Sequence, residues 1–326
     1  MTARAPLTAL HVACGAGGIS LGFESAGIST ALAFDIDQTA TETHLRNMPQ
    51  ARTEVLDLAM THAEDLPHAD VFACGIPCEM YSTAGYQRGL LDDRDLTPDV
   101  ARILEELIAA GRGPRYVFLE NVPPFLRSAG AAMIRQALTG YSITEAIFRH
   151  ADYGICQARK RWHLLAAREG PAPIPVPTHS EEPGFTTDRW IRFGEIRERD
   201  PRDPHYVSAL AWRGIIRRQT ANEIKAIERT STTNTSFAKV YIVDDDSLMS
   251  TVLASWFKGH SRNQATVVFD DYRFRSPTVL EVKRSQGFPD DFEFCGNVRQ
   301  TYEQIARAVA PPFAAAVARA FIEHSR

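Results

Sequence analysis

The sequence lacks the features that mark secreted, membrane-embedded and strongly basic proteins. It has five cysteines, an odd number without framework spacing, which favours a reducing compartment. No apolar run reaches membrane-spanning length, and the N-terminus has no basic-then-apolar signal pattern. The net charge of −4 gives no overall attraction for nucleic acid, so such binding needs a local basic face. We therefore expect a cytoplasmic protein that does not associate with membranes.

The chain otherwise has the composition of an ordinary globular protein. Its 326 residues, 44% hydrophobic and 23% charged, suffice for one large domain or two moderate ones. A proline-rich stretch at 170–177 predicts a domain boundary, because the segment from there to about 275 loses the alternation of strands and helices. A final helix is expected at about 303–323, with a break at Pro311-Pro312.

A glycine-rich turn follows the first expected strand, at residues 7–13. The turn is Cys14-Gly15-Ala16-Gly17-Gly18, and an apolar helix face follows it and ends near Gly27. Glycines let a backbone approach a ligand closely, and free N–H groups at a helix start can face it. The pattern predicts a nucleotide-like cradle; the alternative is a turn that only reverses the chain.

Acidic residues follow the next two expected strands. The strand at 29–34 leads to Asp35 and Asp37, and the strand at 53–56 leads to Asp57. In doubly wound α/β folds, an acid just past the second strand holds ribose hydroxyls. The alternative is a helix N-cap, because Asp37 precedes a helical stretch at 39–47. Both hold if Asp35 binds the ribose and Asp37 caps the helix. These units predict a nucleoside-bearing cofactor, either NAD or S-adenosylmethionine.

A single cysteine, Cys78, follows the fourth expected strand. The turn Gly75-Ile76-Pro77 presents it at the carboxyl end of that strand, where open α/β sheets keep their active sites. The thiolate is the nucleophilic form, so Cys78 needs a lowered pKa or a nearby partner. The alternative is a buried cysteine that only packs. The polar loop that follows, to Thr97, is expected to act as a mobile lid.

Two further motifs carry charged groups that suit catalysis. Glu120 ends the fifth strand, at 116–119, and is a natural proton donor or a hydrogen-bond acceptor for a base edge; alternatively, it caps a helix. Arg159 and Arg161 alternate along an extended segment, which places both guanidiniums on one face, as a phosphate and a carbonyl oxygen require. The alternative is an exposed, charged edge strand.

Arginines and aromatic residues interleave after the proline-rich stretch. A solvated surface is the ordinary explanation for such charges, but interleaved aromatics in an acidic protein favour a nucleic-acid face. The residues concerned are Arg189, Trp190, Arg192, Trp212, Arg213, Arg217 and Arg218.

The motifs, in this order, resemble the C5-cytosine DNA methyltransferase family over nearly the whole chain outside about 175–250. Six segments carry the resemblance: Cys14-Gly15-Ala16-Gly17-Gly18, Pro77-Cys78, Glu120-Asn121-Val122, Gln157-x-Arg159-x-Arg161, Gln286-Gly287-Phe288-Pro289 and Ala308-Val309-Ala310-Pro311-Pro312. The resemblance implies an α/β fold with a Rossmann-like S-adenosylmethionine-dependent methyltransferase sheet and a second, smaller target-recognition domain. The catalytic domain is then 1–169, completed by 300–326, and the target-recognition domain is 170–299.

The resemblance also implies the site residues and their partners. Cys78 attacks C6 of a flipped cytosine, Glu120 holds N3 and the exocyclic amine, and Arg159 and Arg161 hold O2 and a phosphate in either order. The cofactor set is Ala13, Gly15, Gly17, Gly18, Asp35, Ile36, Asp57, Leu58, Pro77, Arg307 and Ala308, and the DNA set is Ser82, Arg88 and Gln157. S-adenosylmethionine is the expected donor, with no metal, and the chain is expected to bind double-stranded DNA as a monomer.

The sequence departs from the family's pattern at four places. His11, Ala13 and Glu79 replace the usual aspartate, phenylalanine and glutamine, and Ala306-Arg307 replaces Gly-Asn. That asparagine lies beside the transferred group, so a cation there is unfavourable next to a sulfonium unless an anion compensates.

Three explanations of Arg307 remain open. It could point to solvent, or pair with Glu79 or the cofactor's amino-acid carboxylate, which leaves methyl transfer intact. It could neutralise a carboxylate on the transferred carbon, which makes carboxy-S-adenosylmethionine the donor and 5-carboxymethylcytosine the product. It could instead block the pocket of a non-catalytic DNA-binding relative.

Other classes of protein account for fewer of these residues. An NAD-dependent dehydrogenase shares the glycine turn and Asp35 but has no use for Pro77-Cys78 together with Glu120. A metal-binding module could use Cys74 and Cys78, but no second Cys/His pair has zinc-site spacing. An RNA cytosine-C5 methyltransferase of the same family stays open, although the long segment after the proline-rich stretch favours DNA.

Overall fold

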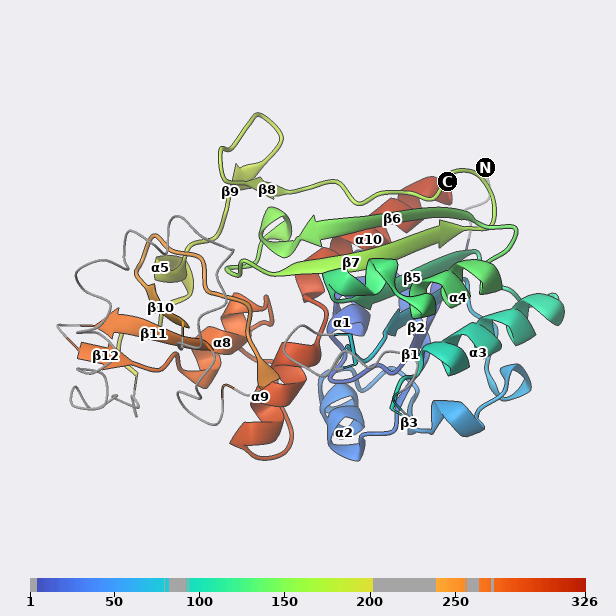
Figure 1. Ribbon diagram of the computed structural model, residues 1–326, viewed down its shortest axis with the longest axis horizontal. Coiled ribbons are helices and arrows are strands. Elements are labelled where there is room, and N and C mark those ends of the chain that lie inside the picture. Colours follow the sequence, from blue (N-terminus) through green and yellow to red (C-terminus); the bar gives the residue numbers. More distant parts are fainter. Residues whose placement is uncertain are drawn as a thin grey trace.

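The computed structural model describes residues 5–78, 80–81, 92, 94–201, 239–254, 256, 264–270 and 273–326. Glu79, Ser82 and Arg88, which the sequence analysis singled out, are not among the described residues. The same holds for four members of the arginine–aromatic group: Trp212, Arg213, Arg217 and Arg218. In Figure 1 a large sheet with helices on both faces lies to the right, and a smaller lobe with its own short strands lies to the left.

The large sheet has seven strands in the order β3-β2-β1-β4-β5-β7-β6. The strands are β1 (Thr8–Val12), β2 (Ser29–Asp35), β3 (Thr53–Val55), β4 (Val71–Gly75), β5 (Tyr116–Asn121), β6 (Ser142–Arg149) and β7 (Lys160–Ala167). The first five are parallel, and β7 runs antiparallel between β5 and β6. The predicted α/β fold class is therefore confirmed, and β1, β2, β3 and β5 begin and end within two residues of the expected strands.

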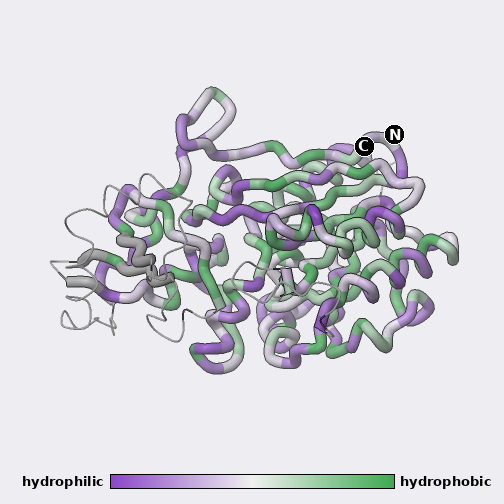
Figure 2. The backbone as a smooth tube through the Cα atoms, in the orientation of Figure 1, coloured by the Kyte–Doolittle hydropathy of each residue, from purple (hydrophilic) through white to green (hydrophobic). Residues whose placement is uncertain are grey.

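Helices cover both faces of this sheet because the strands carry apolar side chains on both sides. On one face α1 (Gly18–Ala26) and α10 (Pro311–His324) pack against residues such as Phe118 and Leu165. On the other face α3 (Thr97–Ala109) and α4 (Ala129–Ala137) pack against residues such as Phe72 and Trp162. Apolar residues follow the inner strands in Figure 2, and hydrophilic residues are more frequent on the connections. The remaining helix at the sheet edge is α2 (Gln38–Asn47).

The predicted break at Pro311-Pro312 is confirmed, since α9 (Val298–Arg307) ends before α10 begins at Pro311. By length and composition, Val298–His324 is apolar enough to cross a membrane, and 72% of its most apolar window is buried inside the protein. This stretch is two helices separated by residues 308–310 and not one continuous apolar run. Its apolarity serves the core, where Phe313 and Phe321 are fully buried.

The smaller lobe is built from short elements. They are α5 (Phe193–Ile196), α8 (Val279–Ser285) and a three-stranded sheet of β10 (Lys239–Val243), β11 (Gln264–Asp270) and β12 (Arg273–Arg275), with the two-stranded β8 (His179–Ser180) and β9 (Asp188–Arg189) beside β6. A fully buried ion pair joins β12 to α8, with Arg275 Nη2 2.7 Å from Glu281 Oε1. Apolar residues of this lobe pack against Ile305 and Ala306 of α9, so the lobe is continuous with the C-terminal helices.

Candidate active site

Two adjacent parallel strands bring Cys78 and Glu120 to the same edge of the sheet. Gly75 at the end of β4 is in register with Glu120 on β5, and the Ile76 N–H donates to the Glu120 carbonyl oxygen at 3.1 Å. The half-buried Pro77 then leads to Cys78, which is partly exposed, while Glu120 is 4% exposed. Because parallel strands share their carboxyl ends, a cysteine and a glutamate far apart in sequence lie at the same edge of the sheet.

Arg159 and Arg161 converge on the carboxylate of Glu120. Arg161 Nε lies 3.2 Å from Glu120 Oε1, and Arg159 Nη2 lies 3.8 Å from the same atom. The prediction that both guanidiniums share one face is confirmed. The alternative of an exposed edge strand is wrong, because β7 lies inside the sheet and Arg159 is 1% exposed.

Burial dominates the electrostatics of Glu120. It raises the pKa of this carboxyl, and the charges of Arg161 and Arg159 oppose the rise without cancelling it. The Oε1 atom makes no well-aligned hydrogen bond despite its two cationic neighbours. Burial thus favours the protonated form of this carboxyl, which can donate a hydrogen bond.

We call Cys78, Glu120, Arg159 and Arg161 the catalytic cluster, after the role that the sequence predicts for them. Arg159 also joins this cluster to the end of α9. Its Nη1 and Nη2 atoms donate to the carbonyl oxygens of Ala306 and Ala308, each at 3.1 Å. Its charge also interacts with Cys78. Burial and the charge of Arg161 lower the pKa of Arg159. A guanidinium remains charged at neutral pH, so a cation lies close to the thiol.

Gln157 lies inside the protein in this structure. It is fully buried, its Nε2 donates to Gln286 Oε1 at 2.7 Å, and its Oε1 accepts from the Val252 N–H at 3.0 Å. The amide therefore joins the segment before β7 to the turn after α8 and to the smaller lobe. Its contact with DNA stays a prediction.

The glycine turn is shaped by its contacts and by its backbone angles. Ala13, Gly15 and Gly17 all have positive φ, at 48°, 53° and 93°, which favours glycine at the latter two positions. A Cβ at Gly17 would lie 2.8 Å from the Cδ2 atom of His44, and a Cβ at Gly18 would overlap the carbonyl oxygen of Val309. The turn can therefore bring backbone N–H groups close to a ligand.

The acidic residues at the strand ends organise this turn and the following helix. Asp35 Oδ2 accepts from the Gly15 N–H at 2.9 Å, and Oδ1 accepts from the Asp37 N–H at 2.9 Å. Burial raises the pKa of Asp35. Asp37 caps α2 by accepting from the N–H groups of Thr39 and Ala40, which confirms the predicted N-cap.

The surroundings of Asp35 fit a nucleoside. Ile36 is 64% exposed directly after Asp35, which leaves an apolar surface beside a carboxylate. Asp57 caps the 3₁₀ turn Leu58–Met60 through the Ala59 N–H at 3.0 Å, and Leu58 is buried. An apolar side chain and a carboxylate in sequence suit the base and the ribose of a cofactor, so the residues present fit S-adenosylmethionine. Ribose binding by Asp35 stays a prediction.

Arg307 is the last residue of α9 and is exposed. The next residue, Ala308, packs beside the glycine turn, since its Cβ would lie 3.3 Å from a Cβ placed on Gly18. Arg159 holds the carbonyl groups on both sides of Arg307, so its backbone is fixed next to the cradle.

Sequence reasoning missed a pair of histidines behind the catalytic cluster. His163 is in register with Glu120, and its Nε2 lies 3.0 Å from the Nε2 of His150. Both residues are fully buried against Phe313, and neither Nδ1 atom has a hydrogen-bond partner. Burial lowers the pKa of both well below the usual value. Position 163 continues the alternation of positions 159 and 161, so the sequence pattern could have predicted that His163 shares their face of the strand.

A second missed residue is Tyr81. Its backbone N–H donates to the Cys78 carbonyl oxygen at 3.1 Å, and its ring lies edge-on to Phe125 with centroids 4.7 Å apart. The Tyr81 hydroxyl donates to the buried carboxylate of Asp95. Nothing in the spacing of these residues predicts the contact.

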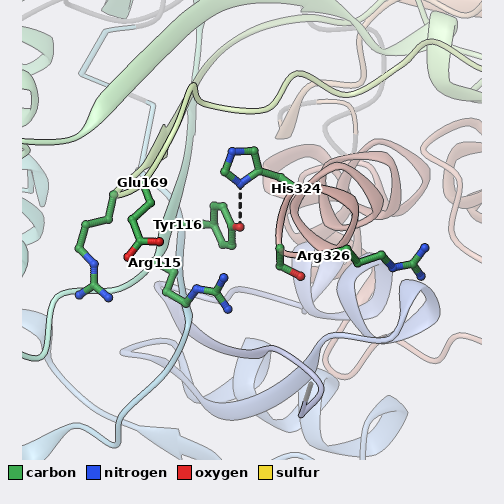
Figure 3. A pocket seen from close by; sticks show the side chains of 7 residues that line it. Arg115, Tyr116, Glu169, His324 and Arg326 are labelled. Carbon is green, nitrogen blue, oxygen red and sulfur yellow. Dashed lines mark hydrogen bonds between the residues drawn. The ribbon is translucent and has the colours of Figure 1, made fainter. Parts of the chain in front are cut away.

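A cavity of about 100 Å³ lies at the opposite end of the sheet from Cys78. It opens where β5 begins and β7 ends, and Figure 3 shows the Tyr116 hydroxyl hydrogen-bonded to His324 Nδ1 at 2.9 Å beside it. Its lining is rich in charge: Arg115, Tyr116, Arg168, Glu169, His324, Ser325 and Arg326. None of the residues of the catalytic cluster contributes to it.

Comparison with known proteins finds relatives over nearly the whole chain. A family model described as C-5 cytosine-specific DNA methylase matches residues 7–323. The Type II methyltransferase M.NgoMIV of Neisseria gonorrhoeae is 30% identical over 325 residues, which cover 97% of each chain. The Entamoeba histolytica methyltransferase EhMeth has a TM-score of 0.73 at 18% identity and covers 99% of this chain and 100% of its own. Dnmt2 of S. pombe has a TM-score of 0.73 at 17% identity, with 98% and 99% covered. At these identities the two structures support the fold alone.

Proposed function

The chain belongs to the C-5 cytosine-specific DNA methylase family, and on this premise we propose that it methylates C5 of cytosine in double-stranded DNA. The observation that carries the proposal is the convergence of Cys78, Glu120, Arg159 and Arg161 at one edge of the sheet. A protein that only bound DNA would have no use for a thiol beside a buried carboxyl. Since M.NgoMIV is a Type II methyltransferase, we further propose a role in restriction–modification.

S-adenosylmethionine, when bound, supplies an electrophilic methyl group on a sulfonium. The turn at 15–18 would hold it through backbone N–H groups, and Asp35 would accept hydrogen bonds from the ribose hydroxyls. Ile36 would contact the adenine, with Asp57 and Leu58 completing the edge of the cradle. The remaining members of the expected set, Ala13, Pro77, Arg307 and Ala308, would line the side nearer to the thiol.

Cys78 acts as the nucleophile. Its thiolate adds to C6 of cytosine, and the new C6–S bond makes C5 nucleophilic enough to take the methyl group. Loss of the C5 proton and cleavage of the C6–S bond then release the modified base and the thiolate. Cys78 cannot reach a base stacked within a duplex, so the target cytosine leaves the helix. The Arg159 cation stabilises the thiolate before attack.

Glu120 acts on the opposite side of the ring. Its raised pKa lets it donate a proton to N3, which stabilises the charge that develops as sulfur adds to C6. The Nη atoms of Arg159 are held by two carbonyl groups, so Arg159 serves to position Glu120 and Cys78. Arg161, whose side chain is 11% exposed, is the better placed of the two to contact O2 or a phosphate.

A second candidate for the transferred group is carboxymethyl, with carboxy-S-adenosylmethionine as the donor. The position of Arg307 favours it, because the backbone of this exposed residue is held immediately before Ala308, which packs beside the glycine turn. An arginine there would pair with a carboxylate on the transferred carbon. The smaller lobe and its linker, at 170–299, would read the DNA sequence as the target-recognition domain in either case.

One experiment tests the reaction and the donor together. The purified protein is incubated with duplex DNA and each donor separately, and the digested nucleosides are weighed by mass spectrometry. We expect 5-methylcytosine from S-adenosylmethionine, and none with Cys78→Ser. A carboxymethylated product, lost in Arg307→Asn, would establish the second donor. Absence of any modified cytosine would overturn the proposal, and transfer to tRNA in preference to DNA would replace DNA by RNA as the substrate.

A further inference from the structure

Three side chains outside the catalytic cluster form a stack. The Cζ atom of Arg149 lies 5.0 Å from the ring centroid of Trp190, and that of Arg192 lies 5.5 Å from it. Trp190 is 5% exposed, and its Nε1 donates to Asp152 Oδ1 at 2.9 Å, so the indole is held in place. Both arginines are half-buried and reach solvent.

The stack holds the two guanidiniums by their faces and leaves the N–H groups at their edges able to donate hydrogen bonds. A guanidinium over an indole is bound through its face, and its N–H groups point outward from its edge. Among the described residues, no carboxylate forms an ion pair with Arg149 or Arg192. The carboxylate of Glu195 accepts from the Arg192 backbone N–H and pairs with Arg189 at 3.5 Å. Two fixed cations with unused edges are suited to bind phosphate oxygens.

The stack lies at the same end of the sheet as Glu120. Arg149 ends β6 in register with Lys160, the first residue of β7, and the next residue, His150, donates its N–H to the Arg159 carbonyl oxygen at 2.9 Å. In Figure 1, β9, which directly precedes Trp190, lies beside this end of β6.

The stack also lies on the side where the chain continues from Cys78. Side chains alternate along β7, so Lys160 shares a face with Trp162, which packs with α3 and α4. Cys78 packs against the same apolar cluster as Trp162. A duplex that presents a cytosine to Cys78 would therefore run past Arg149.

We propose that Arg149 and Arg192, stacked on Trp190, bind backbone phosphates of the DNA strand beside the target cytosine. The inference rests on the proposed function, which supplies the duplex. Each Cζ atom lies within 5.5 Å of the same ring centroid, so the separation of the two guanidiniums cannot exceed the sum of their distances from that centroid. Two neighbouring phosphates of one strand can bridge this separation. Such contacts supply affinity and orientation without reading sequence.

The test is the salt dependence of DNA binding. The dissociation constant for a duplex with the modified site and for an unrelated duplex is measured from low to moderate salt. For Arg149→Ala and Arg192→Ala we expect the slope of log K against log salt to shrink by about 0.9 each, and by about 1.8 in the double variant. Both duplexes should lose affinity by the same factor.

Arg168→Ala is the matched control. It removes an exposed arginine just past the other end of β7, beside the cavity of Figure 3, and should keep the wild-type slope. Thermal unfolding shows whether each variant is folded, and Arg149→Gln replaces Arg149→Ala if the shorter side chain disturbs the stack.

Equal slopes for the wild type and both stack variants would overturn the inference, as would a changed slope with single-stranded RNA but not with duplex DNA. Failure of the proposed function is separate, because it is read as the absence of modified cytosine. A protein that modifies DNA with unchanged slopes rejects the phosphate site alone.

Discussion

Glu120 and Arg161 form a buried pair across two antiparallel strands, with Oε1 and Nε 3.2 Å apart. An ion pair of this kind would ordinarily keep a carboxyl ionised. Here burial outweighs the two arginines, and the pKa of Glu120 is raised. The pair therefore holds the carboxyl in position while burial favours its protonated form, the form that the proposed donation to cytosine N3 requires.

The first prediction concerns the pH dependence of transfer. Because Glu120 works in its protonated form, the single-turnover rate should fall as pH rises through its raised pKa. Arg161→Gln removes a cation that lowers this pKa, so the falling limb should move to higher pH. Arg161→Lys keeps the charge and should leave the limb near its wild-type position. A shift to lower pH in Arg161→Gln would contradict the assignment.

The second prediction concerns Glu120 itself. Glu120→Gln keeps the size of the side chain but removes the acidic proton, so the rate constant for transfer should fall by about 10²- to 10⁴-fold. The dissociation constant for DNA should change much less, because the lost interaction forms mainly as sulfur adds to C6. A loss confined to DNA affinity, with an unchanged single-turnover rate, would show that Glu120 only binds the base.

The third prediction concerns acid stability and the pair His150–His163. Burial holds their pKa values below the unfolded value, so the unfolded state binds more protons as pH drops below about 6.5. The free energy of unfolding should then decrease by up to about 1.4 kcal/mol per pH unit for each histidine. Replacing both histidines by Phe should remove this decrease in the free energy of unfolding between pH 7 and pH 5, as measured by urea unfolding.

The control for this measurement is His44, a buried histidine outside the pair. Burial lowers the pKa of His44 to about 4, and both its ring nitrogens have hydroxyl partners, Ser20 and Thr53. The decrease in the free energy of unfolding that protonation of His44 causes at low pH should persist in the double variant. An unchanged slope of stability against pH in His150→Phe/His163→Phe would show that the pair contributes nothing to acid sensitivity.

Much of the fold was predictable because it depends on local signals. Glycines at 15, 17 and 18, the acid at Asp35 and the short apolar strands are read directly from the chain, and the structure has the strands and the turn where they were expected. The meeting of Cys78 with Glu120 was also predictable, because parallel strands place their carboxyl ends at one edge.

The remaining features depend on contacts between distant segments. Arg159 donates hydrogen bonds to the carbonyl groups of Ala306 and Ala308 because α9 ends beside it in space. No spacing of residues in the sequence predicts these contacts. The burial of Gln157 has the same origin. The stacking of Arg149 on Trp190 joins residues 41 positions apart through the course of the linker, which composition alone cannot give.

The fourth prediction concerns the close approach of the glycine turn to the last motif. Gly18→Ala forces a Cβ against the carbonyl oxygen of Val309, a backbone atom that cannot rotate away. We expect a loss of about 1–3 kcal/mol in the free energy of unfolding and a weaker affinity for S-adenosylmethionine, measured by calorimetry. Gly184→Ala is the control, since its Cβ would make only an ordinary contact, 3.8 Å from Thr187 Oγ1. Equal stability and cofactor affinity in the two variants would mean that the turn can move away from Val309, between α9 and α10, and that the C-terminal motif does not fix the cradle.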